Sequence, residues 1–269
     1  MKYFDSHIHF FPDSLAERAL AQLSETAGLP PQTDGTRRDS LRSLAQSGIA
    51  GGVALHIATS PRQQQAVNAF AAASQSGNLL CFGSLHPDAA DAPEIPAQIC
   101  ALGLKGIKLH PDYQGFYVAE PRMYPLYQRI QDLNLPIAFH TGVDPLSPKD
   151  VHCTPQGLRR VAKDFPRLKI IAAHMGGAYL PKEAELLADA PNVYLDTAVI
   201  SLFLDPDGFR RLVSVFGAER IFFASDLPWA DPRDIQALIR SAGLDQTQQE
   251  QIFYQNACSF FGLNPLLLN

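Results

Sequence analysis

The sequence predicts an α/β fold, a single-domain (β/α)8 TIM barrel that spans residues 1–269. Short apolar or β-branched segments alternate with segments of helical periodicity along the whole chain. Eight such strands are predicted, and the alternation of strand and helix implies parallel pairing. The length of 269 residues is close to the roughly 250 residues of a typical closed barrel.

The predicted strands are short apolar runs bounded by turn residues: Tyr3–Phe10, Gly52–Ile57, Leu80–Leu85, Gly106–His110, Pro136–Thr141, Lys169–His174, Val193–Thr197 and Arg220–Asp226. The segments with helical spacing are Asp13–Ala27, Asp39–Gln46, Arg62–Gln75, Ile95–Leu102, Tyr124–Leu133, Pro155–Asp164, Lys182–Ala188, Pro206–Val215, Pro232–Ser241 and Gln248–Phe261. Thr154 and Asp231 each precede a proline, which is typical of a helix start. An open doubly wound sheet is the alternative, but no G-x-G-x-x-G follows the first strand.

Composition and charge exclude several classes of protein. The formal net charge is -5, and acidic and basic residues are interspersed, which argues against nucleic-acid binding. No apolar run approaches the roughly 20 residues that a membrane helix needs, and the first residues do not resemble a signal peptide. The four cysteines form no C-x-x-C pair. A reduced cytoplasmic location without membrane association is therefore expected.

The histidines collect at the C-terminal ends of the predicted strands, where barrel enzymes carry their active sites. Seven of the eight histidines follow this rule, and Asp226 ends the eighth strand. These strand-end residues are His7, His9, His56, His86, His110, His140, His174 and Asp226. A random distribution of histidines would not produce such a pattern, so we expect a functional site at this end of the strands.

Side-chain alternation along a strand predicts that several of these groups face the barrel interior. His7 and His9 are two residues apart and share a face, as do Lys108 and His110. Burying so many polar groups without a partner would be costly. A divalent metal ion removes that cost, because imidazole and carboxylate suit Zn²⁺ and also bind Mn²⁺, Fe²⁺ or Ni²⁺.

At these residues the sequence resembles the amidohydrolase superfamily, in the branch of aminocarboxymuconate-semialdehyde decarboxylase-like proteins and predicted metal-dependent hydrolases. The resemblance extends from Met1 to about Leu263. Its motifs stand in the family's order, each at a strand end: Asp5-Ser6-His7-Ile8-His9, Gly106-Ile107-Lys108-Leu109-His110-Pro111, Phe139-His140-Thr141-Gly142, Ala173-His174-Met175-Gly176-Gly177 and Ser225-Asp226.

The resemblance implies that one metal ion is bound by four residues, which are His7, His9, His140 and Asp226. Members with two metals use the residues equivalent to His174 and a carboxylated Lys108 for the second ion. In members with one metal, the His174 equivalent polarises a substrate carbonyl or transfers protons. An unmodified Lys108 would instead hold a substrate carboxylate or an internal aspartate. One ion, most simply Zn²⁺, is the favoured expectation, with two as the alternative.

A small-molecule substrate is expected, and its predicted binding residues are Lys108, His110, Tyr113 and Trp229. The competing explanations are structural: His110 fixed by the turn at Pro111, and aromatic side chains that pack helices. Asp5 is predicted to orient a metal ligand. Barrels of this type often form dimers, so a homodimer is one expected assembly.

The first predicted function is hydrolysis of an amide, lactone or other ester bond. A metal ion lowers the pKa of its bound water toward about 7. Asp226 would accept the proton of that water, and His174 would stabilise the oxyanion. The alternative is a non-oxidative decarboxylation of an aromatic or unsaturated carboxylic acid with the same ligands. A metal-binding scaffold without catalysis is the third possibility.

Overall fold

The computed structural model describes residues 1–268. All eight predicted strands form: β1 Asp5–Ile8, β2 Gly52–Leu55, β3 Leu79–Phe82, β4 Ile107–Leu109, β5 Ile137–Phe139, β6 Ile170–Ala172, β7 Val193–Asp196 and β8 Ile221–Phe222. The α-helices are α1 Asp13–Ala27, α2 Arg37–Gln46, α3 Gln64–Ser74, α4 Ile95–Ala101, α5 Pro111–Gln114, α6 Tyr124–Asp132, α7 Pro155–Asp164, α8 Pro181–Ala184, α9 Pro206–Phe216, α10 Pro232–Ser241, α11 Gln246–Glu250 and α12 Asn256–Phe261. Strand–helix alternation along the chain is therefore confirmed.

The chain divides into two compact units. The first, here called the terminal unit, comprises Met1–Ala54, Ser76–Leu79 and Asp196–Asn269. The second, the central unit, comprises Leu55–Gln75 and Leu80–Leu195. That the chain forms one domain stays a prediction.

The terminal unit is organised around β1. This strand pairs in parallel with β2, with Asp5 opposite Gly52. On its other side, the Ser6 N–H donates to the Phe223 carbonyl at 2.9 Å, and Ile8 forms a parallel bridge with Leu227. The end of β8 is thereby fixed beside the end of β1. Every residue of β1 is buried, which suits a strand of a parallel sheet covered on both faces.

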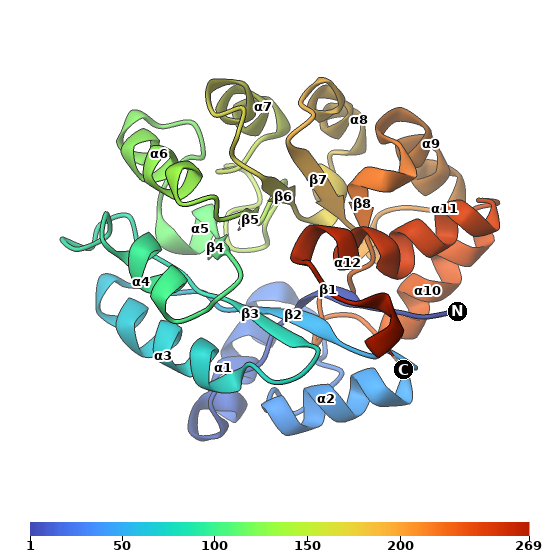
Figure 1. The fold of residues 1–269 in the computed structure, drawn as a ribbon, viewed down its shortest axis with the longest axis horizontal. Helices are drawn as coiled ribbons and strands as arrows, with labels where there is room; N and C mark the ends of the chain where they lie inside the picture. Colours follow the sequence, from blue (N-terminus) through green and yellow to red (C-terminus); the bar gives the residue numbers. More distant parts are fainter. Residues whose placement is uncertain (269) are drawn as a thin grey trace. The chain divides into compact units, whose positions relative to one another are not determined.

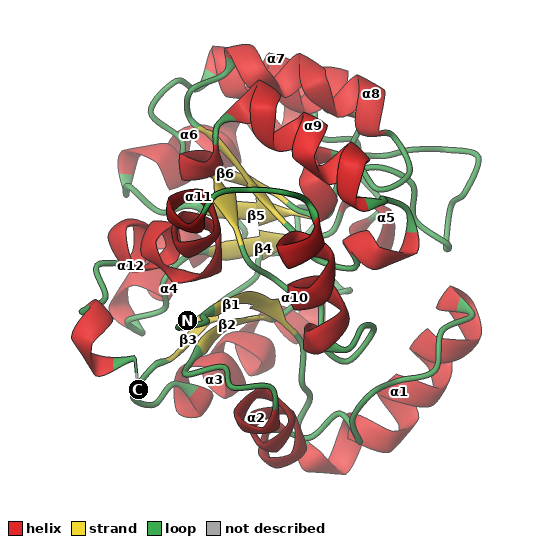
Figure 2. Ribbon diagram, turned by 90° about the vertical axis from the view of Figure 1, so that its right-hand side faces the viewer, coloured by secondary structure: helices red, strands yellow, loops and turns green. Residues whose placement is uncertain are grey.

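The central unit contains four consecutive parallel pairings. Gly83, just after β3, bridges to Ile107 of β4, and β4, β5, β6 and β7 then pair in register. Figure 1 shows α6, α7 and α8 along the outside of these strands, and Figure 2 shows β4, β5 and β6 side by side. The side chains of β5 and β6 are all apolar and buried, as expected for strands enclosed on both faces.

Helix starts follow one local rule that the sequence predicts. α7, α9 and α10 each begin with a proline, which needs no hydrogen-bond partner for its nitrogen. The preceding Thr154, Asp205 and Asp231 each accept a hydrogen bond from a backbone N–H of the first turn. The predicted caps at Thr154 and Asp231 are therefore confirmed.

The structure differs from the predicted elements in several places. The short helix α5 was not expected after β4. The segment Lys182–Ala188 forms α8 and then a 3-10 helix, Glu185–Asp189. The predicted helix Gln248–Phe261 contains a π-helical turn at Gln251–Gln255. This wider turn leaves the carbonyls of Ile252 and Phe253 free to accept hydrogen bonds from Phe223 and Phe4 at 2.8 and 2.9 Å.

The strands are also shorter than predicted, because residues at one or both of their predicted ends leave the regular conformation. Asp226, for example, has φ of 68°, outside the β region. Among residues 1–268, no helix combines the length and the apolar character that crossing a bilayer requires.

Candidate metal centre

The predicted metal-binding motif begins in the terminal unit at β1. Because side chains alternate along a strand, His7 and His9 point the same way. Their Nε2 atoms are 3.1 Å apart, and the two rings meet at 73°. The His7 ring is buried and the His9 ring is partly exposed. Two imidazole nitrogens are thus directed at one point near the end of the strand.

Asp226 brings a carboxylate to the same point. Its Oδ1 atom lies 3.4 Å from Nε2 of His7 and 3.2 Å from Nε2 of His9. The left-handed backbone of Asp226, with φ of 68°, is one that aspartate tolerates better than most residues. Its N–H donates to the His7 carbonyl at 2.8 Å, and its own carbonyl accepts from the Trp229 N–H at 2.8 Å. These bonds hold the turn in place.

The spacing of these three donors fits a divalent cation. Donors 2.0 to 2.2 Å from one ion, at angles between octahedral and tetrahedral, are separated by about 2.8 to 3.6 Å. The three measured separations of 3.1, 3.4 and 3.2 Å all fall in that interval. Two imidazoles and one carboxylate also suit Zn²⁺, Mn²⁺ and Fe²⁺. His7, His9 and Asp226 could therefore hold such an ion without rearrangement.

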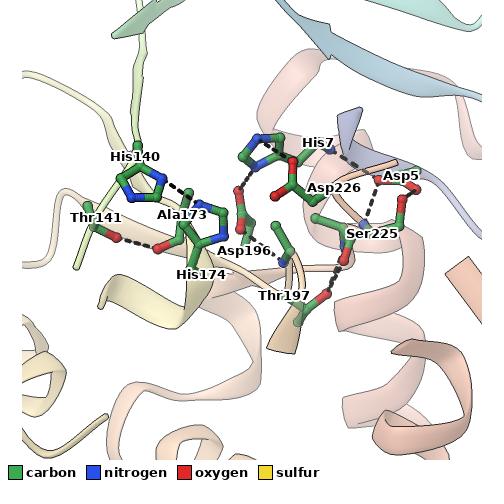
Figure 3. A network of polar contacts seen from close by, with 12 residues as sticks. Asp5, His7, His140, Thr141, Ala173, His174, Asp196, Thr197, Ser225 and Asp226 are labelled. Carbon is green, nitrogen blue, oxygen red and sulfur yellow. Dashed lines mark hydrogen bonds and ion pairs between the residues drawn. The ribbon is translucent and has the colours of Figure 1, made fainter. Parts of the chain in front are cut away.

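Asp5 joins the two segments that carry these donors. Its Oδ1 accepts from the N–H groups of Ser225 and His7 at 3.0 and 3.2 Å, and its Oδ2 accepts from Ser225 Oγ at 2.5 Å. Figure 3 shows this connection between β1 and the residues after β8. Complete burial raises the pKa of Asp5 to about 7, although the hydrogen bonds oppose that shift.

Asp196, the last residue of β7, is a site residue that the sequence analysis missed. Its Oδ2 atom is 2.8 Å from Nδ1 of His7, and its side chain has no exposed surface. In Figure 3 the His7 ring lies between Asp196 and Asp226. The available signal was a lone carboxylate at the end of an apolar strand, in Val193-Tyr194-Leu195-Asp196.

The central unit gathers a second group of histidines at its strand ends. His174 Nε2 and His140 Nδ1 are 2.9 Å apart, and His140 stacks on His110 with ring centres 4.2 Å apart. Asp144, which the sequence analysis did not identify, has its Oδ2 atom 3.5 Å from Nε2 of both His110 and His140. Figure 3 shows the contact of His140 with His174.

The histidines of this second group are arranged less favourably for binding a metal ion. One donor atom from each of His110, His140 and Asp144 lies within 4.8 Å of the others. However, the two rings are nearly parallel, with planes only 9° apart. Their in-plane lone pairs run side by side instead of converging. The arrangement therefore does not favour chelation of one ion by both rings.

The predicted substrate residues lie in both units. In the central unit, Lys108 is buried in β4. The ring of Tyr113 on α5 packs edge-on against the His110 ring, with ring centres 4.5 Å apart. Burial raises the pKa of Tyr113 to about 12, so its hydroxyl keeps its proton. In the terminal unit, Trp229 is half-buried in the turn after Asp226. Whether Lys108 is carboxylated, and whether these residues bind substrate, stay predictions.

The structure thus brings His7, His9 and Asp226 together in the terminal unit, and His110, His140, His174 and Tyr113 together in the central unit. The ligand set that joins His140 to the first group stays a prediction from the sequence.

Comparison with known families gives one match over almost the whole chain. The profile of the amidohydrolase family matches residues 4–263. This interval contains all of the strands and all five motifs. The family that the motifs indicate is therefore confirmed.

Solved structures agree on the fold. An uncharacterised TIM-barrel protein from Bordetella bronchiseptica is 21% identical, with a TM-score of 0.78 over 97% of this chain and 99% of that one. The 5-carboxyvanillate decarboxylase of Sphingomonas paucimobilis is 16% identical, with a TM-score of 0.72 over 98% and 100%. A dihydroxybenzoic acid decarboxylase from a Polaromonas species, solved with manganese and the inhibitor 2-nitroresorcinol, is 17% identical, with a TM-score of 0.71 over 99% and 99%. The predicted TIM-barrel fold is confirmed in preference to the doubly wound alternative.

Proposed function

We propose that this chain, which belongs to the amidohydrolase family, catalyses the metal-dependent, non-oxidative decarboxylation of an aromatic or unsaturated carboxylic acid. The observation that carries the proposal is the donor set of His7, His9 and Asp226, spaced for one divalent ion. The substrate class is supported by the similarity in fold to decarboxylases of carboxyvanillate and dihydroxybenzoic acid.

The resident group in this proposal is one divalent metal ion. When bound, the ion would supply a Lewis acid for the substrate carboxylate and an oxygen next to it. His7, His9 and Asp226 would hold it, and the motif resemblance assigns His140 to the same ion. Zn²⁺ is the first candidate on donor chemistry. Mn²⁺ is the second, since manganese is bound in the Polaromonas relative.

The chain's own groups would then handle one proton. In the reaction, the bond between the carboxyl carbon and the ring or vinyl carbon breaks, carbon dioxide leaves, and the electron pair stays on the carbon. That carbon must take a proton from an acid. We assign this proton transfer to Asp226 or His174. An unmodified Lys108, which is buried in β4, would hold a substrate oxygen by a hydrogen bond from its Nζ.

Hydrolysis of an amide or ester is the second candidate, and the geometry of Asp226 is compatible with it. The Oδ1 atom of Asp226 faces both imidazoles at 3.4 and 3.2 Å. With Oδ1 directed at the ion, Oδ2 could accept a proton from an attacking water. The same residue therefore suits either reaction.

A substrate panel separates the two reactions. Metal-loaded protein is incubated with hydroxybenzoic acids that carry an oxygen beside the carboxylate, and with lactones and amides, while carbon dioxide and acid release are measured. We expect carbon dioxide from the acids and a loss of at least about 100-fold in Asp226→Asn, since acid–base catalysis contributes roughly 100- to 10,000-fold. Asp207→Asn, an exposed carboxylate paired with Arg210, is the matched control.

Each outcome of this panel has a defined meaning. Acid or amine release without carbon dioxide would replace decarboxylation by hydrolysis. If the His7→Ala/His9→Ala variant binds as much metal as the parent, the proposed metal site is wrong. Full activity in Asp226→Asn would remove its proton-transfer role.

The proposal also covers the ligand class, the assembly and the cellular location of the enzyme. The ligand is a small molecule, and a homodimer and a cytoplasmic location stay predictions from the sequence. Sedimentation analysis of the purified protein and fractionation of the producing cells would check them.

A further inference from the structure

The buried carboxylate of Asp196 makes two separate hydrogen bonds. Its Oδ1 atom accepts from the Ala198 N–H at 3.1 Å, which orders the turn after β7. Its Oδ2 atom lies 2.8 Å from Nδ1 of His7. Asp196 and His7 are both buried and are 189 residues apart in the sequence. The first bond is local, whereas the second fixes one ring of the candidate metal centre.

The contact with His7 bears on where the imidazole proton lies. An ionised carboxylate has only acceptors, so the ring nitrogen facing it must carry the proton. Beside an ionised Asp196, Nδ1 of a neutral His7 would therefore be protonated, and Nε2 would keep its lone pair. Nε2 is the nitrogen that faces His9 at 3.1 Å and Asp226 at 3.4 Å. In the other tautomer, the proton would occupy the position from which His7 has to bind an ion.

We propose that Asp196 is a positioning residue that sets the tautomer and orientation of His7 and thereby gives the centre its metal affinity. The inference rests on the metal centre of the proposed function. A carboxylate on the far nitrogen of a metal-bound imidazole also makes that imidazole a more basic ligand. In this role Asp196 would touch neither the ion nor the substrate.

The substitution Asp196→Asn tests the role with almost no change in volume. The asparagine carbonyl can replace Oδ1 as the acceptor for the Ala198 N–H. The amide NH₂ group then takes the place of Oδ2 and faces Nδ1 of His7. An amide that faces Nδ1 of His7 donates a hydrogen bond and so favours the tautomer with the proton on Nε2. We expect Zn²⁺ or Co²⁺ affinity, measured in competition with a chromophoric chelator, to fall about 10- to 100-fold.

The tautomer is measured in the metal-free parent, independently of catalysis. Long-range nitrogen–proton NMR of ¹⁵N-histidine protein, assigned with His7→Gln, should show a proton on Nδ1 of His7. The same spectrum of Asp196→Asn should show a shift toward a proton on Nε2. Asp207→Asn is the control and should keep both the spectrum and the affinity of the parent, since that carboxylate is 78% exposed.

A neutral His7 with its proton on Nε2 in the parent, or an affinity of Asp196→Asn within threefold of the parent, would overturn the inference. Should Asp196→Asn not fold, the tautomer in the parent still decides. Failure of the proposed centre has a different signature, because His7→Ala/His9→Ala would then keep its affinity for the ion. Loss of affinity in that variant with none in Asp196→Asn contradicts only the role of Asp196.

Discussion

Asp5 is a carboxyl group enclosed entirely by protein, and its surroundings oppose its ionisation. Burial raises its pKa from 3.8 to about 7, although Ser225 and His7 donate hydrogen bonds to it. The unfolded chain releases this proton near pH 4, whereas the folded chain keeps it until about pH 7. Folding is therefore favoured at low pH by this one group, and the contribution is lost as the pH rises through that interval.

For metal-free protein, we expect Asp5→Asn to flatten the pH dependence of the free energy of unfolding. The amide resembles the protonated acid, since it accepts from the backbone and donates to Ser225 Oγ. One proton gives a slope of at most about 1.4 kcal/mol per pH unit. Urea unfolding between pH 5 and 8 in the presence of a chelator measures it. Parallel curves for parent and variant would contradict the raised pKa.

The four cysteines differ in their exposure. Cys81, Cys153 and Cys258 are buried, Cys100 is exposed, and all four are free thiols. Burial raises the pKa of Cys153 far above its usual range, and partial burial also raises that of Cys100. Of the four, only Cys100 is accessible to a reagent. Because the thiolate is the reactive form, the reactivity of Cys100 should increase as the pH rises.

We therefore expect one rapidly reacting thiol in the native protein. A chromogenic disulfide reagent should react with Cys100 at a rate that increases between pH 7 and 9, and the Cys100→Ser variant should lack this phase. All four thiols should react after denaturation. Rapid reaction of a second thiol in the native Cys100→Ser protein would show that the buried cysteines are accessible.

At the scale of elements, the turn after β5 shows how a site loop is attached to its neighbours. Gly142 donates to the Cys153 carbonyl at 3.0 Å, and the neighbouring Val143 donates to the Ala178 carbonyl at 3.0 Å. Gly142 has φ of 91°, and a Cβ atom there would lie 2.1 Å from the backbone nitrogen of Ala178. Only glycine fits, because both the backbone conformation and the close approach exclude a side chain.

Gly142→Ala should accordingly lower the free energy of unfolding by about 3 kcal/mol or more, since backbone strain alone costs roughly 1 to 3 kcal/mol. Gly103→Ala separates the two causes. Gly103 also has a positive φ, of 71°, but no atom lies within 4 Å of the place that a Cβ atom would occupy. Gly103→Ala should lower the free energy of unfolding by only about 1 kcal/mol. If urea unfolding shows the same loss of unfolding free energy for Gly142→Ala and Gly103→Ala, the contact with Ala178 contributes nothing.

For the whole molecule, the main expectation is a coupling between metal binding and stability. A ligand that binds only the folded chain adds about 2.7 kcal/mol to the free energy of unfolding at 100 times its Kd. For a chain of 269 residues, this corresponds to a rise in Tm of roughly 5 to 10 °C. Removing the ion with a chelator should reverse the rise.

Thermal unfolding with and without Zn²⁺ or Mn²⁺ measures this coupling. His7→Ala/His9→Ala should lose the response to the ion. His152→Gln should keep it, because the His152 ring contacts the backbone carbonyls of Pro111, the first residue of α5, and Phe116. An undiminished shift in His7→Ala/His9→Ala would place the stabilising ion elsewhere in the chain.

The fold class could be predicted from the sequence because strands and helices leave local periodic patterns. The bounds of α1, α7 and α10 agree with the predicted ranges, since apolar spacing and caps such as Asp231 are local signals. The pairing of His7 with His9 was equally accessible, because two residues along a strand return to the same face. Its partner Asp226 was identified from its place at a strand end and from the motif resemblance.

Other features were decided by tertiary structure alone. The contact of Asp196 with His7, the bonds of Asp5 to Ser225, and Asp144 between His110 and His140 all depend on which loops and strand ends become neighbours. Asp5 and Ser225 are 220 residues apart in the sequence, and no pattern along the chain indicates that they become neighbours. The physical reason is that periodicity reports the face on which a side chain lies, whereas strand pairing selects the group opposite. The sequence by itself determined the barrel class, the imidazoles at its strand ends and the carboxylate of Asp226, and only the packing decided that Asp196 and Asp144 contact those imidazoles.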